Sequence, residues 1–186
     1  GCNSLNQVIF ENNSLLSSIQ KYTFGKCIKI KQITIPSFIS SIGNQSFQYC
    51  LSLTEIEIPT SVTSIRDNAF NGCVSLNKIS IPSSVTSIGE YAFFQCTALT
   101  KIAIPNALPL IDENDLMIVS ATSIGNNVFS SCSSLVQITI PSSITIITDF
   151  MFYGCSSLEK IEIPENVKKI GESSFERCSS LKYISI

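Results

Sequence analysis

Thiols are the most reactive side chains of this chain, and their spacing is regular. Seven of the eight cysteines follow a 23-residue interval, interrupted by one interval of 36: Cys27, Cys50, Cys73, Cys96, Cys132, Cys155 and Cys178. A thiol can bind a metal ion, form a disulfide, act as a nucleophile or lie buried as a small apolar group. The surrounding residues decide which of these roles the spacing favours.

The surrounding sequence gives little support to a metal site or a catalytic thiol. No two cysteines form a C-x-x-C pair and the chain has no histidine, so neither zinc-ligand spacing nor the usual catalytic base is found. Disulfides between neighbouring repeats stay open, because equivalent α-carbons of stacked repeats would lie about 4.8 Å apart. One thiol at the same point of every repeat is typical of a small buried hydrophobe. We therefore predict a ladder of free, buried thiols, with Cys2 as the exception, and neither metal nor cofactor.

Serines and carboxylates offer two further chemistries. Cys-Ser-Ser-Leu recurs at Cys132, Cys155 and Cys178, but serine catalysis in its usual form needs a histidine, so these serines are predicted to cap backbone groups at turns. Glu55 and Glu57 could form an acid–base pair of the glycosidase kind. They would share one strand, without a pocket to give them different environments. The chain is therefore predicted not to be an enzyme.

The thiol interval belongs to a longer repeated pattern, whose clearest copy reads CVSLNKISIPSSVTSIGEYAF over residues 73–93. Copies or part-copies begin near 2, 27, 50, 73, 96, 132, 155 and 178. A fixed period of roughly 20 to 50 residues is the signature of a solenoid. The sequence predicts a single array of about eight repeats over residues 1–186. Since neither end resembles a polar capping repeat, we expect it to be a fragment of a longer parent protein.

Each apolar position of the repeat has a structural role. The alternation of Ile79 and Ile81 predicts a strand with one buried face, and Val8 and Phe10 predict the same in the first copy. Val85 and Ile88, three apart, predict a short extended piece or 3₁₀ turn. The A-F-x-x-C segment predicts a short helical turn. One phenylalanine in each repeat predicts a continuous buried column: Phe24, Phe47, Phe70, Phe93, Phe129, Phe152 and Phe175.

The motif L-x-x-I-x-I followed by proline, with the segment I-G-x-x-A-F and the 23-residue period, resembles the BspA-like subclass of leucine-rich repeats. The resemblance implies an α/β repeat solenoid, which is a right-handed superhelix. Its parallel β-sheet would form the concave face, and short helical turns or irregular segments the convex face. The resemblance also implies a cell-surface or secreted protein that acts in adhesion or host interaction.

The first candidate binding surface is the concave sheet face. Residues that alternate with the buried isoleucines point outward there, and the following could contact a partner: Gln32, Glu55, Glu57, Lys78, Lys101, Gln137, Lys160 and Tyr183. Glu55 is expected to pair with Lys78 across the strands. Lys78 and Lys101 would be adjacent like charges, which an anionic group of a partner could offset. The alternative is a solvated sheet face without a partner.

The second candidate surface is an insertion at about 107–119. The interval of 36 exceeds the period by 13 residues, and two apolar runs flank an acidic centre. We predict a protruding hairpin with an acidic tip, or a loop folded onto the edge of the solenoid. A loop that only packs its own residues is the alternative, and the acidic run lacks the spacing of a known calcium loop. The candidate contact residues are Leu108, Leu110, Ile111, Asp112, Glu113, Asp115, Leu116, Met117, Ile118 and Val119.

Composition narrows the partners. Charged residues make up 14% of the chain, its net charge is −2, and no basic patch is dense enough for nucleic acid. No apolar stretch approaches the roughly 18 residues of a membrane span. We predict a non-enzymatic binding module for protein–protein contact or cell-surface adhesion and host interaction, with a protein, or a glycan, on a cell surface or matrix. The alternative is a structural segment that spaces domains or self-associates through uncapped ends. Asn12 and Asn44 begin N-glycosylation sequons, which matter only in a secreted parent.

Overall fold

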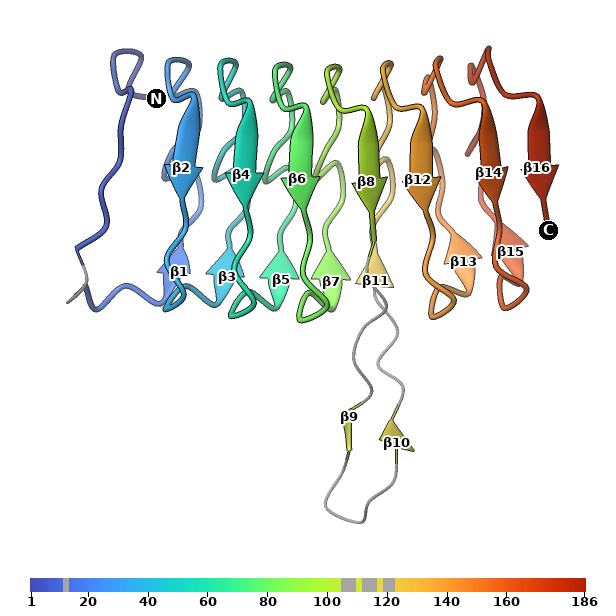
Figure 1. Cartoon of the computed structure of the whole chain (residues 1–186), viewed down its shortest axis with the longest axis horizontal. Coiled ribbons are helices and arrows are strands. Elements are labelled where there is room, and N and C mark those ends of the chain that lie inside the picture. Colours follow the sequence, from blue (N-terminus) through green and yellow to red (C-terminus); the bar gives the residue numbers. More distant parts are fainter. Residues whose placement is uncertain (12–13, 105–109, 112–116, 119–122) are drawn as a thin grey trace.

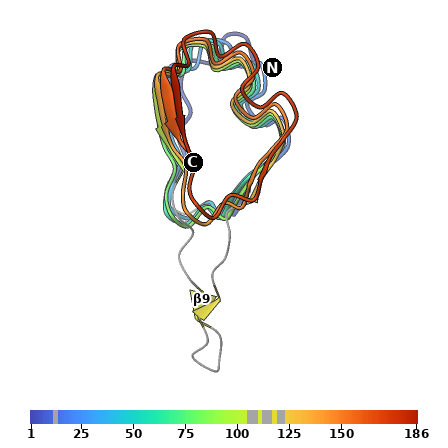
Figure 2. The same ribbon diagram turned by 90° about the vertical axis from the view of Figure 1, so that its right-hand side faces the viewer.

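The computed structural model describes residues 1–11, 14–104, 110–111, 117–118 and 123–186. The chain is a parallel β-solenoid of about seven turns, whose coils stand side by side in a row (Figure 1). Seen along the row, the coils superpose into one closed outline (Figure 2). The predicted stacking of repeats is confirmed.

One side of each coil after the first is formed by a three-residue strand from the I-x-I motif. These strands are β2 (Gln32–Thr34), β4 (Glu55–Glu57), β6 (Lys78–Ser80), β8 (Lys101–Ala103), β12 (Gln137–Thr139), β14 (Lys160–Glu162) and β16 (Tyr183–Ser185). The central isoleucine is buried in all but β16, and the flanking residues point outward. We call the outward side of these strands the strand face.

The strand face is not one continuous hydrogen-bonded sheet. Parallel ladders join β2, β4 and β6, then β8 and β12, then β14 and β16. Between β6 and β8, and between β12 and β14, the strands are neighbours without a ladder. These two interruptions divide the face into three segments.

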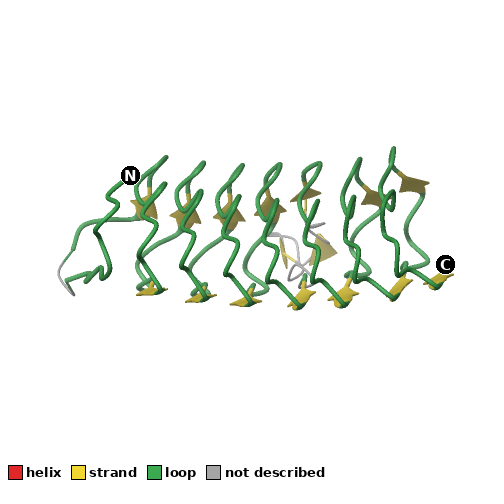
Figure 3. Cartoon of the chain, turned by 90° about the horizontal axis from the view of Figure 1, so that it is seen from above, coloured by secondary structure: helices red, strands yellow, loops and turns green. Residues whose placement is uncertain are grey.

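The second residue of the apolar pair that follows the proline lies in a second row of strands on the other side of the coils (Figure 3). Its members are β1 (Ser18–Ile19), β3 (Ser41–Ile42), β5 (Ser64–Ile65), β7 (Ser87–Ile88), β11 (Ser123–Ile124), β13 (Ile146–Ile147) and β15 (Lys169–Ile170). Parallel ladders join the first five and the last two. The short extended piece is therefore confirmed, and the structure adds that it pairs from coil to coil.

The strand predicted at Val8 and Phe10 is wrong. Residues 5–11 form no strand, although Val8 and Phe10 pack half-buried against the core and Ile9 between them is 73% exposed. The first interval between cysteines is 25 residues rather than 23. The alternating pattern decides which side chains are buried, but a ladder also needs register with its neighbour, and that register is not kept here.

The predicted helical turns of the convex side are also wrong, because the described residues contain no helix. In each coil two residues, four apart, take positive φ, for example Tyr91 at 56° and Gln95 at 57°. Left-handed residues interrupt an α-helix. We call this segment the outer turn, and its residues with positive φ are Tyr22, Lys26, Gln45, Tyr49, Asn68, Gly72, Tyr91, Gln95, Asn127, Ser131, Phe150, Gly154, Ser173 and Arg177.

The outer turns are joined to one another by backbone hydrogen bonds. The N–H groups of Tyr91, Phe93 and Gln95 donate to carbonyl oxygens of the next coil over 3.0 to 3.1 Å. The amides between them close tight turns inside their own coil, as Phe94 does with the carbonyl of Tyr91. In the outer turn every second N–H group therefore donates to the neighbouring coil and is not available for the hydrogen bonds of a helix.

The core beneath these turns consists of the predicted columns. Rings of the phenylalanine column stack nearly parallel between Phe47 and Phe152, with centroids 5.3 to 5.9 Å apart. The seven regularly spaced cysteines are free and buried, and Cys2 is free and exposed. Each thiol from Cys50 onward donates to the carbonyl of a phenylalanine in the coil before it, over 3.1 to 3.3 Å. The free thiol ladder is confirmed.

Candidate functional site

The strand face presents all of its predicted contact residues to solvent. Their side chains are exposed in every case: Gln32, Glu55, Glu57, Lys78, Lys101, Gln137, Lys160 and Tyr183. The ladders set their neighbours, since Lys101 lies opposite Gln137 and Lys160 opposite Tyr183. The face thus offers a regular row of polar side chains on a rigid support.

Glu55 and Lys78 form the predicted cross-strand pair. The register places them opposite each other, and Nζ of Lys78 lies 2.8 Å from Oε1 of Glu55. The hydrogen bond and the charge of Glu55 raise the pKa of Lys78 above its ordinary value. Lys78 therefore stays protonated, and its charge is paired with that of Glu55.

Replacing Glu55 by glutamine is expected to lower the pKa of Lys78 toward 10.5, because the ammonium loses its anionic acceptor. Nuclear magnetic resonance titration of the Lys78 side chain measures this change. Glu162→Gln is the matched control, because Glu162 lies on β14 and makes no contact with Lys78. An unchanged pKa in Glu55→Gln would show that the pair does not form in solution.

Lys101 and Lys160 differ from Lys78 in having no anionic partner. Within the described part of the chain neither lysine takes part in an ion pair. Both are exposed, and both lie on strands beside an interruption of the sheet, β8 and β14. These two cations are available to an anionic group of a partner.

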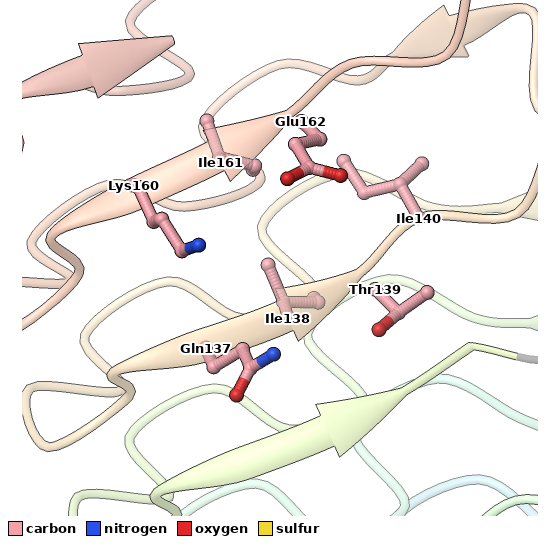
Figure 4. Close-up of a pocket in the computed structure, with 7 residues that line it drawn as sticks. All are labelled: Gln137, Ile138, Thr139, Ile140, Lys160, Ile161 and Glu162. Atoms are coloured by element: carbon pink, nitrogen blue, oxygen red, sulfur yellow. The ribbon is translucent and has the colours of Figure 1, made fainter. Parts of the chain in front are cut away.

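A hollow of about 120 Å³ lies between β12 and β14 (Figure 4). Gln137 and Thr139 border it from one strand, Lys160 and Glu162 from the other, and isoleucines form its floor. The hollow lies where the ladder is interrupted. Sequence reasoning missed it, because the isoleucine pattern of these strands is the same as that of paired ones.

Two further recesses lie toward the start of the chain. One of about 190 Å³ lies between β2 and β4, and one of about 520 Å³ is bordered by Gln7, Lys29, Lys31 and Gln32 among others. Lys29 and Lys31 were not among the predicted contact residues. They lie just before the strand, outside the alternating positions that the sequence singled out.

The structure gives no sign of a catalytic arrangement around the carboxylates. Glu55 and Glu57 are both exposed, and the recess beside them is smaller than the roughly 300 Å³ at which small-molecule pockets begin. Among the described residues no group of three or more metal-binding side chains comes together. A helix long and apolar enough to cross a membrane is likewise not found among them.

The insertion contains a short antiparallel pair. β9 (Leu110–Ile111) pairs with β10 (Met117–Ile118), with Ile111 opposite Met117. Both strands lie beyond the edge of the coils (Figure 1), while β7 pairs with β11 across the insertion. The remaining predicted contact residues lie outside the described residues: Leu108, Asp112, Glu113, Asp115, Leu116 and Val119.

Solved structures with the same coil arrangement come from bacteria. A leucine-rich repeat protein from Bacteroides ovatus has a TM-score of 0.79 and 31% identity, over 90% of this chain and 41% of that one. The leucine-rich repeat protein of T. pallidum has a TM-score of 0.81 and 28% identity, over 92% and 74%. This chain spans less than half the length of the B. ovatus protein. No match was found among curated proteins.

Sequence comparison agrees with the structural comparison. The family model of the BspA type leucine rich repeat region matches residues 1–118 and 116–186. These two ranges include every coil and both rows of strands. The protein belongs to the BspA-type leucine-rich repeat family.

Proposed function

We propose that this chain is a non-enzymatic binding module whose strand face contacts a protein. The observation that carries the proposal is the pair of exposed lysines, Lys101 and Lys160, which have no anionic partner among the described residues of an otherwise mixed polar face. A partner that brings carboxylates to these strands would gain charge complementarity without first breaking an existing ion pair. Lys78, held by Glu55, contributes less.

The inserted hairpin is the second contact region of the proposal. β9 and β10 lie beyond the edge of the coils, where a partner on the strand face could reach them. Insertions in repeat proteins often border a binding face. The proposal extends to adhesion or host interaction at a cell surface, or after secretion, on the strength of the family resemblance. A surface glycan is the second class of partner in this proposal. It would contact the same two regions, the strand face and the hairpin.

Two variants test the strand face and the hairpin. Lys101→Glu with Lys160→Glu is expected to reduce capture of biotinylated surface proteins from cultured cells at least tenfold, since both cations become repulsive. Deletion of residues 107–119, which restores the 23-residue interval, is expected to reduce capture with the fold intact. Capture is measured by surface plasmon resonance, and the fold by circular dichroism.

Lys78→Glu with Glu55→Lys is the matched control, because it inverts a satisfied pair and preserves the net charge. It should leave capture nearly unchanged. Sedimentation at several protein concentrations separates partner binding from self-association of the chain. If the lysine reversal and the hairpin deletion both capture partners as well as the parent does, the proposed surfaces are wrong.

A further inference from the structure

A second site lies away from the strand face, on the outer turns of the first two complete coils. Tyr22 and Tyr49 both take positive φ, at 63° and 57°, and their side chains are 54% and 38% exposed. Together with Gly1, Gly25, Lys26, Gln45 and Gln48 they border a hollow of about 520 Å³. This volume falls within the roughly 300–1,000 Å³ of small-molecule sites.

The ring of Tyr49 is positioned by a glycine of the next coil. A Cβ atom at Gly72 would overlap Cδ1 and Cε1 of Tyr49, so the ring can lie over the next coil only because Gly72 has no side chain. The equivalent glycine, Gly154, has the same positive φ, and its nearest atom would be Oγ of Ser131 at 3.6 Å. Tyr49 therefore presents an aromatic surface that lies against the backbone of the next coil beside the hollow.

The polar groups of the hollow are suited to hydroxyl groups. Nε2 of Gln45 donates to Oε1 of Gln48 over 3.2 Å. This bond leaves the carbonyl of Gln45 and the amino group of Gln48 without a partner in the described chain. One acceptor and one donor thus lie side by side, and a sugar hydroxyl can both donate and accept.

The charge of the hollow is positive. Lys26 borders the hollow, and none of the residues that border it carries a carboxylate. A second cation lies close, since Nζ of Lys21 is 5.1 Å from the centroid of the Tyr22 ring. An anionic ligand would therefore be favoured, although the chain as a whole has a net charge of −2.

We propose that this hollow binds an acidic saccharide, whose ring carries a carboxylate. The apolar face of the sugar ring packs on Tyr22 and Tyr49, as amphipathic tyrosines allow. Neighbouring hydroxyls bond to Gln45 and Gln48, and the carboxylate bonds to Lys26. This site does not include the strand face. The result of its test therefore does not decide whether the strand face binds a protein.

The test is a titration with digalacturonate, followed by nuclear magnetic resonance of the labelled chain. Resonances of Tyr22, Tyr49 and the two glutamine side-chain amides are expected to shift together. Lys26→Gln should weaken binding about tenfold, the usual effect of losing one charge-assisted hydrogen bond. The neutral galactose disaccharide should bind about tenfold more weakly than the acid, and Lys26→Gln should remove that difference.

Two matched glycine variants separate the role of the Tyr49 ring from general strain. Gly72→Ala and Gly154→Ala introduce the same strained alanine at the same repeat position, but only the first displaces Tyr49. Gly72→Ala is expected to weaken digalacturonate binding at least tenfold, and Gly154→Ala to leave it unchanged. Tyr49→Leu, which keeps an apolar side chain and removes the ring, should match Gly72→Ala and serves if that variant does not fold.

Three results would overturn the proposal. The first is the absence of shifts at Tyr22 and Tyr49 when digalacturonate is added to the parent chain. The second is equal weakening by Gly72→Ala and Gly154→Ala together with an unaffected Tyr49→Leu. The third is tighter binding of an acidic hexapeptide than of digalacturonate at the same resonances, which would assign the hollow to a peptide.

Discussion

Replacing Phe93 by alanine is expected to lower the free energy of unfolding by about 3–5 kcal/mol. The ring is fully buried and stacks against Phe70 at 5.4 Å and Phe129 at 5.7 Å, so its removal leaves a cavity bordered by rings from two other coils. Those rings are fixed by their own stacking partners and cannot close the cavity. Urea unfolding followed by circular dichroism measures the change.

The adjacent residue supplies the control for this prediction. Phe94 is only half-buried and makes an edge contact with Tyr91 at 5.5 Å. Phe94→Ala should therefore cost less than half as much as Phe93→Ala. If the two variants lower the free energy of unfolding equally, the phenylalanine column does not stabilise the fold more than a half-buried ring does.

Raising the pH above 9 is expected to destabilise the folded chain steeply. Burial raises the pKa of Cys50 and of Cys132 from 9.0 to about 12, and it raises that of Cys73, Cys96 and Cys155 as well. An unfolded thiol loses its proton near pH 9, whereas the folded one keeps it. The unfolded state then binds fewer protons, so stability is complete below pH 9 and falls between pH 9 and about 12.

Each such thiol contributes up to about 1.4 kcal/mol per pH unit to this fall. Lysines and tyrosines also titrate in this range, so the thiol contribution is isolated by a variant. In Cys96→Ala the slope of unfolding free energy against pH between 9 and 11 should be shallower by roughly that amount. Urea unfolding at intervals of half a pH unit measures it. Parallel slopes for the parent and Cys96→Ala would contradict the prediction, whatever their offset at neutral pH.

The sequence predicted those parts of the fold in which one residue type has one role in every repeat. Cysteine, phenylalanine and isoleucine recur at fixed positions, and they are buried where the pattern placed them except in the first and last coils. The register also followed, so the pair of Glu55 and Lys78 could be predicted from spacing alone. These features depend on the period, and the period can be read directly.

The outer turns could not be predicted in the same way. Positive φ is taken there by Tyr91, Gln95 and Ser131, whose side chains do not reveal a left-handed backbone. Apolar spacing in this segment fits a helix equally well, and only the hydrogen bonds between coils decide against it.

The surfaces that we propose for binding could be located from the sequence only in part. Alternation along the strands identified the exposed row, but not the recess between β12 and β14, since the isoleucine pattern of these strands is the same as that of the others. The position of the Tyr49 ring beside the outer-turn hollow depends on the missing Cβ atom at Gly72 in the next coil. This contact joins two residues that are 23 positions apart. A pattern that assigns one role to each position of the repeat does not show which side chains of neighbouring coils touch.

The hydrogen bonds between outer turns give this side of the array a direction. At each junction three N–H donors belong to the earlier coil and three carbonyl acceptors to the later one, as for Tyr22, Phe24 and Lys26. Each coil therefore presents N–H donors of its outer turn to the coil that follows and carbonyl acceptors to the coil that precedes it. A coil turned end for end within the array would place like groups opposite each other on this side, so all coils must share one orientation.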